Sequence, residues 1–433
     1  MEYLYEKRDL PINPPVRSRW VVLWSQFMKR KIVISARPTI GGIFRFYRNL
    51  RNTLAPLGWD IYAVSIGKSE ASTWEEGFNY SGCIKISPEE EDNLSAAKCF
   101  VKWCIKNNIS IVMPMNSGIC NAAVLHMPSD ISIIQRCYST SLYSYDVVLS
   151  CWQRISRIIA TSKRQKDDLI CNYSISAKKI AFIPMGVDID AFHSPSVHRK
   201  KYKDVLTIGY IGRLSDYDKG IFLLPRLVQS LMKHLVSFEL QIIGNGPQEL
   251  KLRKALKDEQ DKGFVNFIGG KPHKEIPKLL GKIDILVMPS NFEGFGLSLI
   301  EAMAAGVVPI VSRIRGVTDW IVNDGYTGYV CPIGSNMSFT KAIIDLYQNP
   351  KKLSQMSRFA TKTAKDRFNL EKMGESYDTL FSKVLLEKDI GTICKSWDNF
   401  EIPIAFLPNW HRFIPSSAKK IFRRWMEKGG RTI

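Results

Sequence analysis

Two glutamates in one short segment are the residues of this sequence best placed for binding chemistry. Residues 288–309 read MPSNFEGFGLSLIEAMAAGVVP, a pattern that predicts a strand, a glycine-interrupted loop and a helix. Glu293 lies in the loop, and Glu301 follows eight residues later on the second turn of the expected helix. Gly294 and Gly296 allow the backbone to approach a ligand without a clash from a Cβ atom. A carboxylate in such a loop can accept hydrogen bonds from sugar hydroxyls.

The first turn of that helix predicts an anion site. Amides at the start of a helix have no partner within the helix and favour a negatively charged group. Here those amides belong to Gly296, Leu297 and Ser298. The segment therefore predicts a pocket that holds a diphosphate at the amides and a sugar at a carboxylate.

A second segment, 209–220 (GYIGRLSDYDKG), supplies two cations. A predicted strand ends at Gly212 and Arg213, and Lys219 with Gly220 is expected to open the next helix. Arginine can bind a phosphate through two hydrogen bonds, and lysine acts as a point charge. Both would lie at the carboxyl ends of parallel strands, where open α/β sheets bind ligands. Taken alone, the segment equally fits a surface turn with a salt bridge.

The rest of the chain predicts two successive α/β units that would position these loops. Strands alternate with helices in both, which implies right-handed crossovers and parallel sheets covered on both faces. Polar residues 197–204 read as the linker between them. Strands are expected at 31–35, 58–66, 110–114, 131–134, 156–160 and 180–184, then at 206–211, 238–243, 265–268, 284–288, 307–311 and 328–332. Helices near the second set are expected at 220–235, 248–257 and 296–305.

These segments together resemble the retaining glycosyltransferases of family 4, of the bacterial envelope polysaccharide and lipopolysaccharide type. Glu293 and Glu301 match the E-x7-E motif of that family, and Arg213 and Lys219 match its basic pair. Residues 242–247 (IIGNGP) match its glycine turn, and residues 179–188 (KIAFIPMGVD) match the segment near its hinge. The resemblance covers most of 205–335 and, more weakly, 30–190.

The resemblance implies the GT-B fold, which is two Rossmann-like domains that face each other across a cleft. It implies an acceptor domain over 30–195 and a nucleotide-sugar donor domain over 205–372. C-terminal helices and a basic tail, 373–433, are expected to cross back to the N-terminal domain. The family's activity is transfer of a sugar from a nucleoside diphosphate, UDP or GDP, to a glycan or lipid-linked acceptor.

The resemblance also assigns roles to residues. Glu301 would bind the ribose, Glu293 the transferred sugar, and Arg213 and Lys219 the departing diphosphate. Gly42 would bring its amide to the diphosphate across the cleft. The implied catalytic residues are Glu293, Arg213 and Lys219, and the implied donor-binding residues are Gly42, Gly212, Arg213, Lys219, Gly244, Glu293, Gly294, Phe295, Gly296, Leu297, Ser298 and Glu301. No metal or further cofactor is required, because cationic side chains take that place.

Two features depart from the expected pattern. Many relatives carry a histidine after the strand equivalent to 131–134, but this chain reads Gln135, Arg136, Cys137 and Tyr138 there. His126 lies upstream in a different context and is expected to be structural. The D-x-D at 188–190, a metal-binding pattern in another glycosyltransferase fold, is expected to be a turn.

The charge of the chain is local. Lys and Arg number 61 and Asp and Glu 41, which gives +20. Residues 17–51 contribute nine basic residues and no acid, and from Trp410 onward seven basic residues face only Glu427. Residues 417–428 predict a basic amphipathic helix, which is typical of a membrane interface, although a helix that packs on its own protein has the same pattern. Nucleic acid is the weaker alternative partner, because no reading motif accompanies the charge.

Composition sets the remaining limits. With 45% apolar and 24% charged residues, the chain is globular, and no run of about 18 apolar residues predicts a membrane span. Nine cysteines without C-x-x-C spacing fit reduced thiols, so we expect a cytoplasmic protein at the inner membrane surface. Two other functions stay open: a nucleotide-sugar epimerase of the same fold, and a non-enzymatic nucleic-acid-binding protein.

Overall fold

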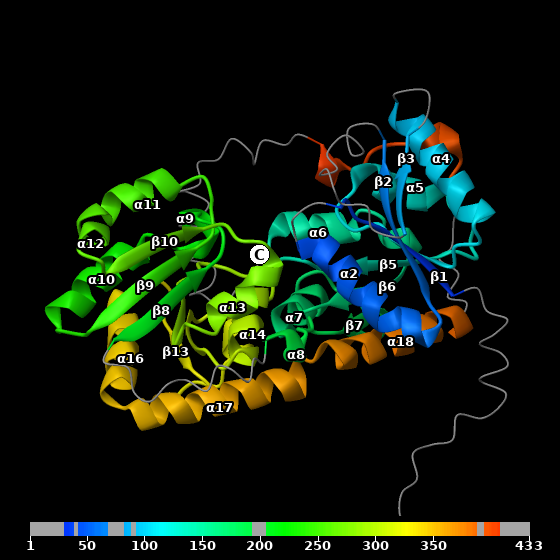
Figure 1. Ribbon diagram of the computed structural model, residues 1–433. Helices are drawn as coiled ribbons and strands as arrows, with labels where there is room; N and C mark the ends of the chain where they lie inside the picture. The colour runs from blue at the N-terminus through cyan, green and yellow to red at the C-terminus, as the bar shows by residue number, and fades with distance from the viewer. Residues whose placement is uncertain are drawn as a thin grey trace, which may run out of the picture.

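The structure, a computed structural model, describes residues 30–38, 42–67, 82–87, 92–192, 205–387 and 394–407. Within these ranges the chain forms two α/β domains, each built on one parallel sheet with helices on both faces (Figure 1). The predicted amphipathic helix 417–428, the linker 197–204 and the basic residues Arg17, Arg19 and Lys29 lie outside the described residues. None of the helices in the described ranges has the length and apolar character that crossing a membrane requires.

The N-terminal sheet has the strand order β3-β2-β1-β4-β5-β6-β7. Its strands are β1 (Lys31–Ser35), β2 (Asp60–Ile66), β3 (Cys83–Ile86), β4 (Ile111–Met113), β5 (Ser132–Arg136), β6 (Ile155–Ala160) and β7 (Ile180–Phe182). Its helices are α2 (Gly42–Leu54), α4 (Asn93–Lys106), α5 (Gly118–Ala123), α6 (Leu142–Leu149), α7 (Lys163–Cys171) and α8 (Ile189–Phe192). The apolar residues of the central strands β1 and β4 are buried, as a sheet covered on both faces requires.

The C-terminal sheet has the order β10-β9-β8-β11-β12-β13. Its strands are β8 (Leu206–Ile211), β9 (Phe238–Ile243), β10 (Val265–Gly269), β11 (Ile285–Met288), β12 (Val308–Ser312) and β13 (Tyr329–Cys331). Its helices are α9 (Asp216–Lys219), α10 (Leu223–Lys233), α11 (Glu249–Ala255), α12 (Lys257–Asp261), α13 (Ile276–Leu280), α14 (Leu297–Ala304), α15 (Thr318–Ile321), α16 (Asn336–Gln348) and α17 (Pro350–Arg367). The expected α/β class with two Rossmann-like sheets is confirmed.

The last long helix returns to the N-terminal domain. After α17 the chain pairs with the β7–α8 loop, where Val187 accepts from Leu370 and donates to Phe368. Helix α18 (Leu370–Glu387) then packs along α2 (Figure 1). The indole of Trp59 donates to Asp378 on α18 at 2.8 Å, and both residues are buried. The two domains are thus tied together by a helix as well as by their facing loops.

Two helix predictions differ from the structure in their ends. The helix expected over 220–235 is present as α10 but begins at Leu223, because Gly220, with a φ of +61°, ends the short helix α9. Lys219 therefore closes a helix and does not open one. The helix expected over 248–257 is interrupted at Leu256, between α11 and α12.

Candidate active site

Lys219 and Glu293 form an ion pair in the loops that follow β8 and β11. A Cβ atom at Gly220 would lie 2.2 Å from the carbonyl oxygen of Pro289, so only glycine lets these two loops pack so closely. Lys219 Nζ lies 2.6 Å from Glu293 Oε1, and the hydroxyl of Ser290 donates to the same oxygen at 2.8 Å. The Glu293 side chain is buried, with 9% of its surface exposed. The structure thus brings these two predicted site residues together.

Arg213 lies beside this pair but nearer to solvent. Its guanidinium Nη2 is 2.6 Å from Asp218 Oδ2, one residue before Lys219, and 61% of its side chain is exposed. The buried hydroxyl of Tyr210 donates to the Arg213 carbonyl at 2.8 Å, which fixes the backbone at the end of β8. Burial, together with the charges of Glu293 and Asp218, raises the pKa of Tyr210 well above its ordinary value. The hydroxyl of Tyr210 therefore stays neutral near the carboxylates of Glu293 and Asp218.

Glu301, on α14, receives donors from both domains. Arg45 Nη1, on α2, lies 2.7 Å from Glu301 Oε1. His273 Nε2, in the 3₁₀ turn η6 (His273–Glu275), lies 3.0 Å from the same oxygen. Sequence reasoning missed both partners: Arg45 was only one member of a basic stretch, and His273 carried no motif. The position of Arg45, three residues after Gly42 on a predicted helix, was the one usable signal.

The two glutamates share one geometry. In each, Oε1 accepts from two side chains of the protein, whereas Oε2 accepts no hydrogen bond from the residues that the structure describes. The protein donors hold each carboxylate in one orientation. A carboxylate oxygen has further capacity to accept hydrogen bonds, so each glutamate keeps one oxygen for the hydroxyls of a ligand.

The amino end of α14 carries no side-chain cap. Gly296 is the N-cap residue, with φ of +94°, and Leu297 and Ser298 form the first turn. Amides at this position have no partner within the helix and can bind an anion. The ring of Phe295 packs against Phe368 with centroids 5.9 Å apart, so Phe295 offers the site only its backbone.

The other predicted glycines lie in different surroundings. Gly244 has a φ of +142°, and a Cβ there would lie 1.9 Å from the carbonyl oxygen of Gly212. These two glycines therefore allow two loops of the C-terminal domain to pack against each other. Gly42 is the exposed first residue of α2, and no atom of the described residues lies within 4 Å of a Cβ placed there. That space is open to an approaching group.

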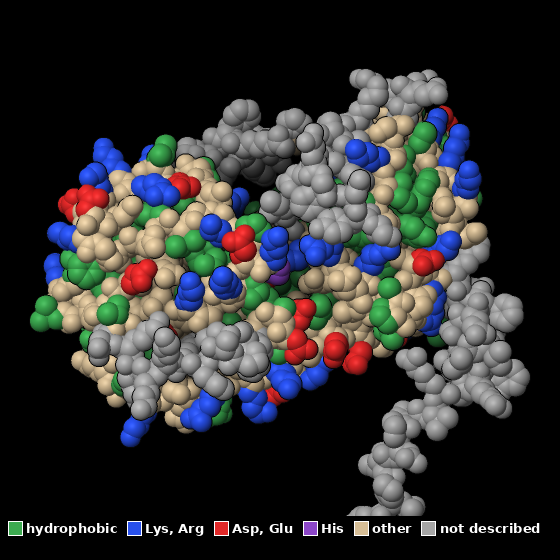
Figure 2. Space-filling view, in the orientation of Figure 1, with side chains coloured by type: hydrophobic (Ala, Val, Ile, Leu, Met, Phe, Trp, Pro, Cys, Tyr) green, Lys and Arg blue, Asp and Glu red, His purple; other side chains and the backbone are tan. Residues whose placement is uncertain are grey.

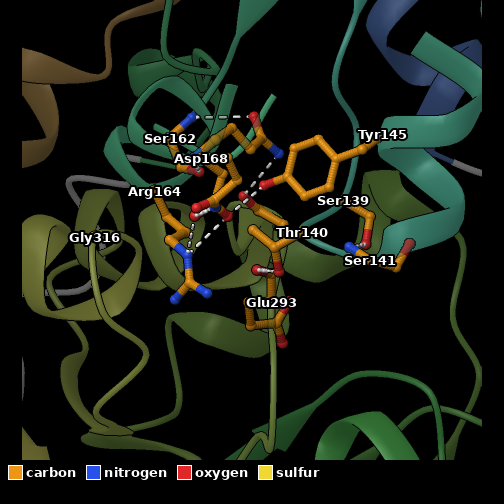
Figure 3. A network of polar contacts seen from close by, with 12 residues as sticks. Ser139, Thr140, Ser141, Tyr145, Ser162, Arg164, Asp168, Glu293 and Gly316 are labelled. Atoms are coloured by element: carbon orange, nitrogen blue, oxygen red, sulfur yellow. Dashed lines mark hydrogen bonds and ion pairs between the residues drawn. The ribbon is translucent and has the colours of Figure 1, made fainter. Parts of the chain in front are cut away.

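The Glu293 loop is held from the N-terminal domain (Figure 3). The hydroxyl of Thr140 donates to the Glu293 carbonyl at 3.1 Å, and Gln165 Nε2 donates to the Gly294 carbonyl at 3.4 Å. A Cβ at Gly294 would lie 2.4 Å from the carbonyl oxygen of Tyr138. Gly294 thus allows direct contact between the domains, in addition to any role toward a ligand.

Of the residues at the position of the family's histidine, Gln135 and Arg136 are buried within the N-terminal domain, whereas Tyr138 contacts the Glu293 loop. Gln135 is buried and donates to Asn121 at 2.7 Å. Arg136 is buried with its guanidinium 4.3 Å from the ring centroid of Phe46, and burial lowers its pKa. Tyr138 alone of this group reaches the Glu293 loop, through its backbone.

Two residues set aside in the sequence are structural. His126 Nδ1 lies 2.9 Å from the carbonyl oxygen of Lys395, and its ring stacks on Trp397 at 4.4 Å, so its structural role is confirmed. Asp188 accepts from the backbone N–H of Ala191 at 3.1 Å and precedes α8, so the D-x-D forms the start of a short helix instead of the expected turn.

Comparison with known proteins relates part of the chain to a family. Residues 194–363, which contain both cations and both glutamates, match the family model described as Glycosyl transferases group 1. This segment of the chain resembles that family. A glycosyltransferase of Rickettsia africae ESF-5 has the same fold, with a TM-score of 0.68 and 18% identity over 83% of this chain and 99% of that one. The structure of Anabaena HepE, solved with UDP and glucose, has a TM-score of 0.67 and 17% identity over 82% of this chain and 100% of that one.

Among curated relatives of this chain, N-acetyl-alpha-D-glucosaminyl L-malate synthase of Bacillus anthracis is 29% identical, over 84% of this chain and 100% of its own length. The GPI3 subunit of phosphatidylinositol N-acetylglucosaminyltransferase from Saccharomyces cerevisiae (strain YJM789) is 26% identical, over 42% of this chain and 43% of its own. The GT-B fold that the sequence motifs implied is confirmed, and the match of residues 194–363 supports the implied resemblance to glycosyltransferases.

Proposed function

We propose that this chain transfers a sugar, with retention of configuration, from a nucleoside diphosphate sugar to a glycan or lipid-linked acceptor in cell-envelope polysaccharide or lipopolysaccharide synthesis. The observation that carries the proposal is the paired geometry of Glu293 and Glu301. Each is buried, fixed through Oε1 and open at Oε2. In this proposal Glu301 accepts from the ribose hydroxyls and Glu293 from the transferred sugar.

The two cations would act on the diphosphate. Lys219 is fixed 2.6 Å from Glu293, which puts its charge beside the sugar's carboxylate partner. Arg213, more exposed, can turn toward the outer phosphate. Fixed positive charge near a leaving diphosphate stabilises the transition state, and the first-turn amides of α14 add to it. The protein itself would supply this charge, and the departing phosphate can take the acceptor's proton.

UDP is the nucleotide we propose first, with GDP as the alternative. HepE was solved with UDP, and a relative from Streptococcus gordonii that is 28% identical over 48% of this chain is named for UDP-N-acetylglucosamine. The setting we propose is the cytoplasmic face of an anionic membrane. A row of Lys and Arg side chains crosses the junction of the domains in Figure 2, which fits such a surface. Binding to phosphatidylglycerol vesicles that weakens as salt rises tests this setting.

Thermal unfolding with UDP, GDP, ADP and CMP tests the donor site. A ligand at 100 times its dissociation constant adds about 2.7 kcal/mol to the free energy of unfolding. We expect one nucleoside diphosphate to raise the Tm. Glu301→Ala should remove most of that shift, whereas Glu293→Ala should keep it and lose sugar transfer, because the free nucleotide has no sugar. Glu249→Ala, at an intermediate-exposure position on α11, is the control.

Two outcomes would refute the proposal. One is a Tm that no nucleotide changes. The other is full transfer activity in either glutamate variant. Conversion of the donor without any acceptor would favour the epimerase instead.

A further inference from the structure

A group of exposed apolar side chains lies on the N-terminal domain beside the candidate site. Leu142 and Tyr143 at the start of α6 are 47% and 41% exposed, and Ile404 and Leu407 at the turn η8 (Ile404–Phe406) are 83% and 45% exposed. We call these four residues the rim patch. Helix α6 and η8 pack together, and η8 is the red segment above α6 in Figure 1. The ring of Phe406, 6.5 Å from that of Tyr143, joins the two parts.

A polar cluster adjoins the rim patch. The hydroxyls of Tyr138 and Tyr143 each donate to Asn116 Oδ1, both at 3.0 Å. Asn116 is exposed, and its Nδ2 donates to no residue in the described part of the chain. Asn116 and Tyr138 follow β4 and β5, so the cluster stands at the carboxyl edge of the N-terminal sheet.

This cluster touches the loop of Glu293. The carbonyl of Tyr138 contacts Gly294, and Thr140, two residues further on, donates to the Glu293 carbonyl. A group bound at the polar cluster would therefore lie next to the sugar that Glu293 is proposed to hold. Tyrosine offers an apolar ring with a polar tip, and asparagine offers an amide donor, which together suit a hydroxylated ring.

We propose that the acceptor is amphipathic, with a sugar at the polar cluster and an alkyl chain on the rim patch. This inference rests on the proposed function and chooses the lipid-linked acceptor over the free glycan. Removal of apolar surface from water is favourable, and a sugar alone has no apolar group that could cover this patch. The sequence after Leu407 supports the choice, because it holds seven basic residues and one acid from Trp410 onward. Such an excess of positive charge is attracted to an anionic lipid surface.

The test measures binding of n-dodecyl β-D-maltoside, below its micelle concentration, and of maltose to the full chain. We expect the alkyl glycoside to bind at least about tenfold more tightly than maltose. The double variant Leu142→Ser with Ile404→Ser should bring the two affinities within about threefold. Asn116→Ala should weaken both probes. The matched control is Leu235→Ser with Leu250→Ser, two leucines of the other domain that are 89% and 83% exposed.

Three outcomes would overturn the inference. Equal binding of the two probes to the unmodified chain is the first, and an equal loss in the control variant is the second. The third is a lowered Tm of the rim-patch variant with unchanged binding of the alkyl glycoside, which would mean that the chain's own residues cover the patch. The nucleotide Tm shift is measured on the same variants. Its presence alongside lost alkyl glycoside binding supports the inference, whereas its absence from the unmodified chain refutes the proposed function.

Discussion

Arg45 and His273 show how this site prepares a carboxylate for a ligand. Glu301 is buried, and two donors from opposite domains meet at one of its oxygens. A buried carboxylate without partners would bear a large desolvation cost, so the two donors offset that cost and orient the Glu301 side chain. Arg45 is also the contact through which α2 of one domain reaches α14 of the other. If Glu301 binds the donor as proposed, Arg45 couples donor binding to the relative position of the domains.

Replacing Arg45 with methionine tests that coupling. We expect the dissociation constant of the nucleotide identified by thermal unfolding to rise about tenfold, because a hydrogen bond to a charged group contributes about 1.5–3 kcal/mol. Isothermal titration calorimetry measures it. Lys102→Met, which removes an exposed charge from α4, should leave the constant unchanged. Unaltered affinity in Arg45→Met would show that Glu301 needs only His273.

For single residues, the sequence predicts which residues of one segment form the candidate site better than it predicts their contact partners from the other domain. Glu293 and Glu301 could be named because their spacing, their glycines and the following helix lie in one stretch of chain. Lys219 could be named with them through the family motif. Arg45 could not be assigned to Glu301, because 256 residues separate the two and only the packing of the domains brings them together.

At the scale of elements, the Glu293 loop is shaped by packing from both sides. On its own domain, Asn291 N–H donates to the Asp218 carbonyl at 2.8 Å, which ties the loop to α9. From the other domain, Thr140 donates a hydrogen bond to the carbonyl of Glu293, and Gln165 donates one to the carbonyl of Gly294. Gln165 is itself fixed, since its Oε1 caps the first turn of α7. A loop fixed at this many points can hold its carboxylate in one place while the ligand changes.

Thr140→Val removes the hydroxyl but keeps the shape of the side chain. We expect kcat/KM to fall about tenfold, because a small displacement of Glu293 weakens contacts to the transferred sugar. The free energy of unfolding should change by only about 1 kcal/mol. Thr340→Val is the matched control, since Thr340 is also buried and donates to a backbone carbonyl at 2.9 Å within α16. Equal losses of activity in both variants would contradict a specific role for Thr140.

The elements themselves were predictable where burial dominates. Strands β1, β8 and β9 have the predicted bounds, because apolar β-branched runs in a doubly covered sheet have few alternatives. Helix ends were less predictable. Gly220 fits a helix start by composition, but its left-handed backbone and its contact with Pro289 depend on the other loop. Strand β3 escaped prediction because it is a four-residue edge strand that pairs only with β2.

At the scale of the whole molecule, the domains share part of one core. Phe46 of α2 packs on Tyr377 of α18 with ring centroids 5.6 Å apart, and Trp59 packs on Phe381 at 5.5 Å. Thus a helix that follows the C-terminal sheet in sequence completes the N-terminal domain in space. Local sequence patterns give the helix but not the domain it covers, because its partners are distant in the sequence: Trp59 lies 319 positions from Asp378, and Gly186 lies 187 positions from Met373.

Buried thiols in both domains make the free energy of unfolding depend on pH in the alkaline range. Burial raises the pKa of Cys137 and Cys151 in the N-terminal domain, and of Cys331 in the C-terminal domain, to about 12 from 9.0. The unfolded chain releases these protons above pH 9, whereas the folded chain keeps them up to about pH 12. Their contribution to the free energy of unfolding is therefore complete below pH 9 and falls above it, by up to about 1.4 kcal/mol per pH unit for each thiol.

Urea unfolding at pH 8 and pH 10, under reducing conditions, measures this effect. The net charge of +20 at pH 7 decreases over the same range, which relieves repulsion and acts in the opposite direction, so the unmodified chain alone cannot separate the two. Cys137→Ala separates them, because it removes one buried thiol and leaves the lysines unchanged. We expect the difference between pH 8 and pH 10 to shrink by about 1.4 kcal/mol in Cys137→Ala and to stay the same in Cys171→Ala, whose thiol is exposed. The same pH difference in all three chains would mean that burial of Cys137 does not control its proton.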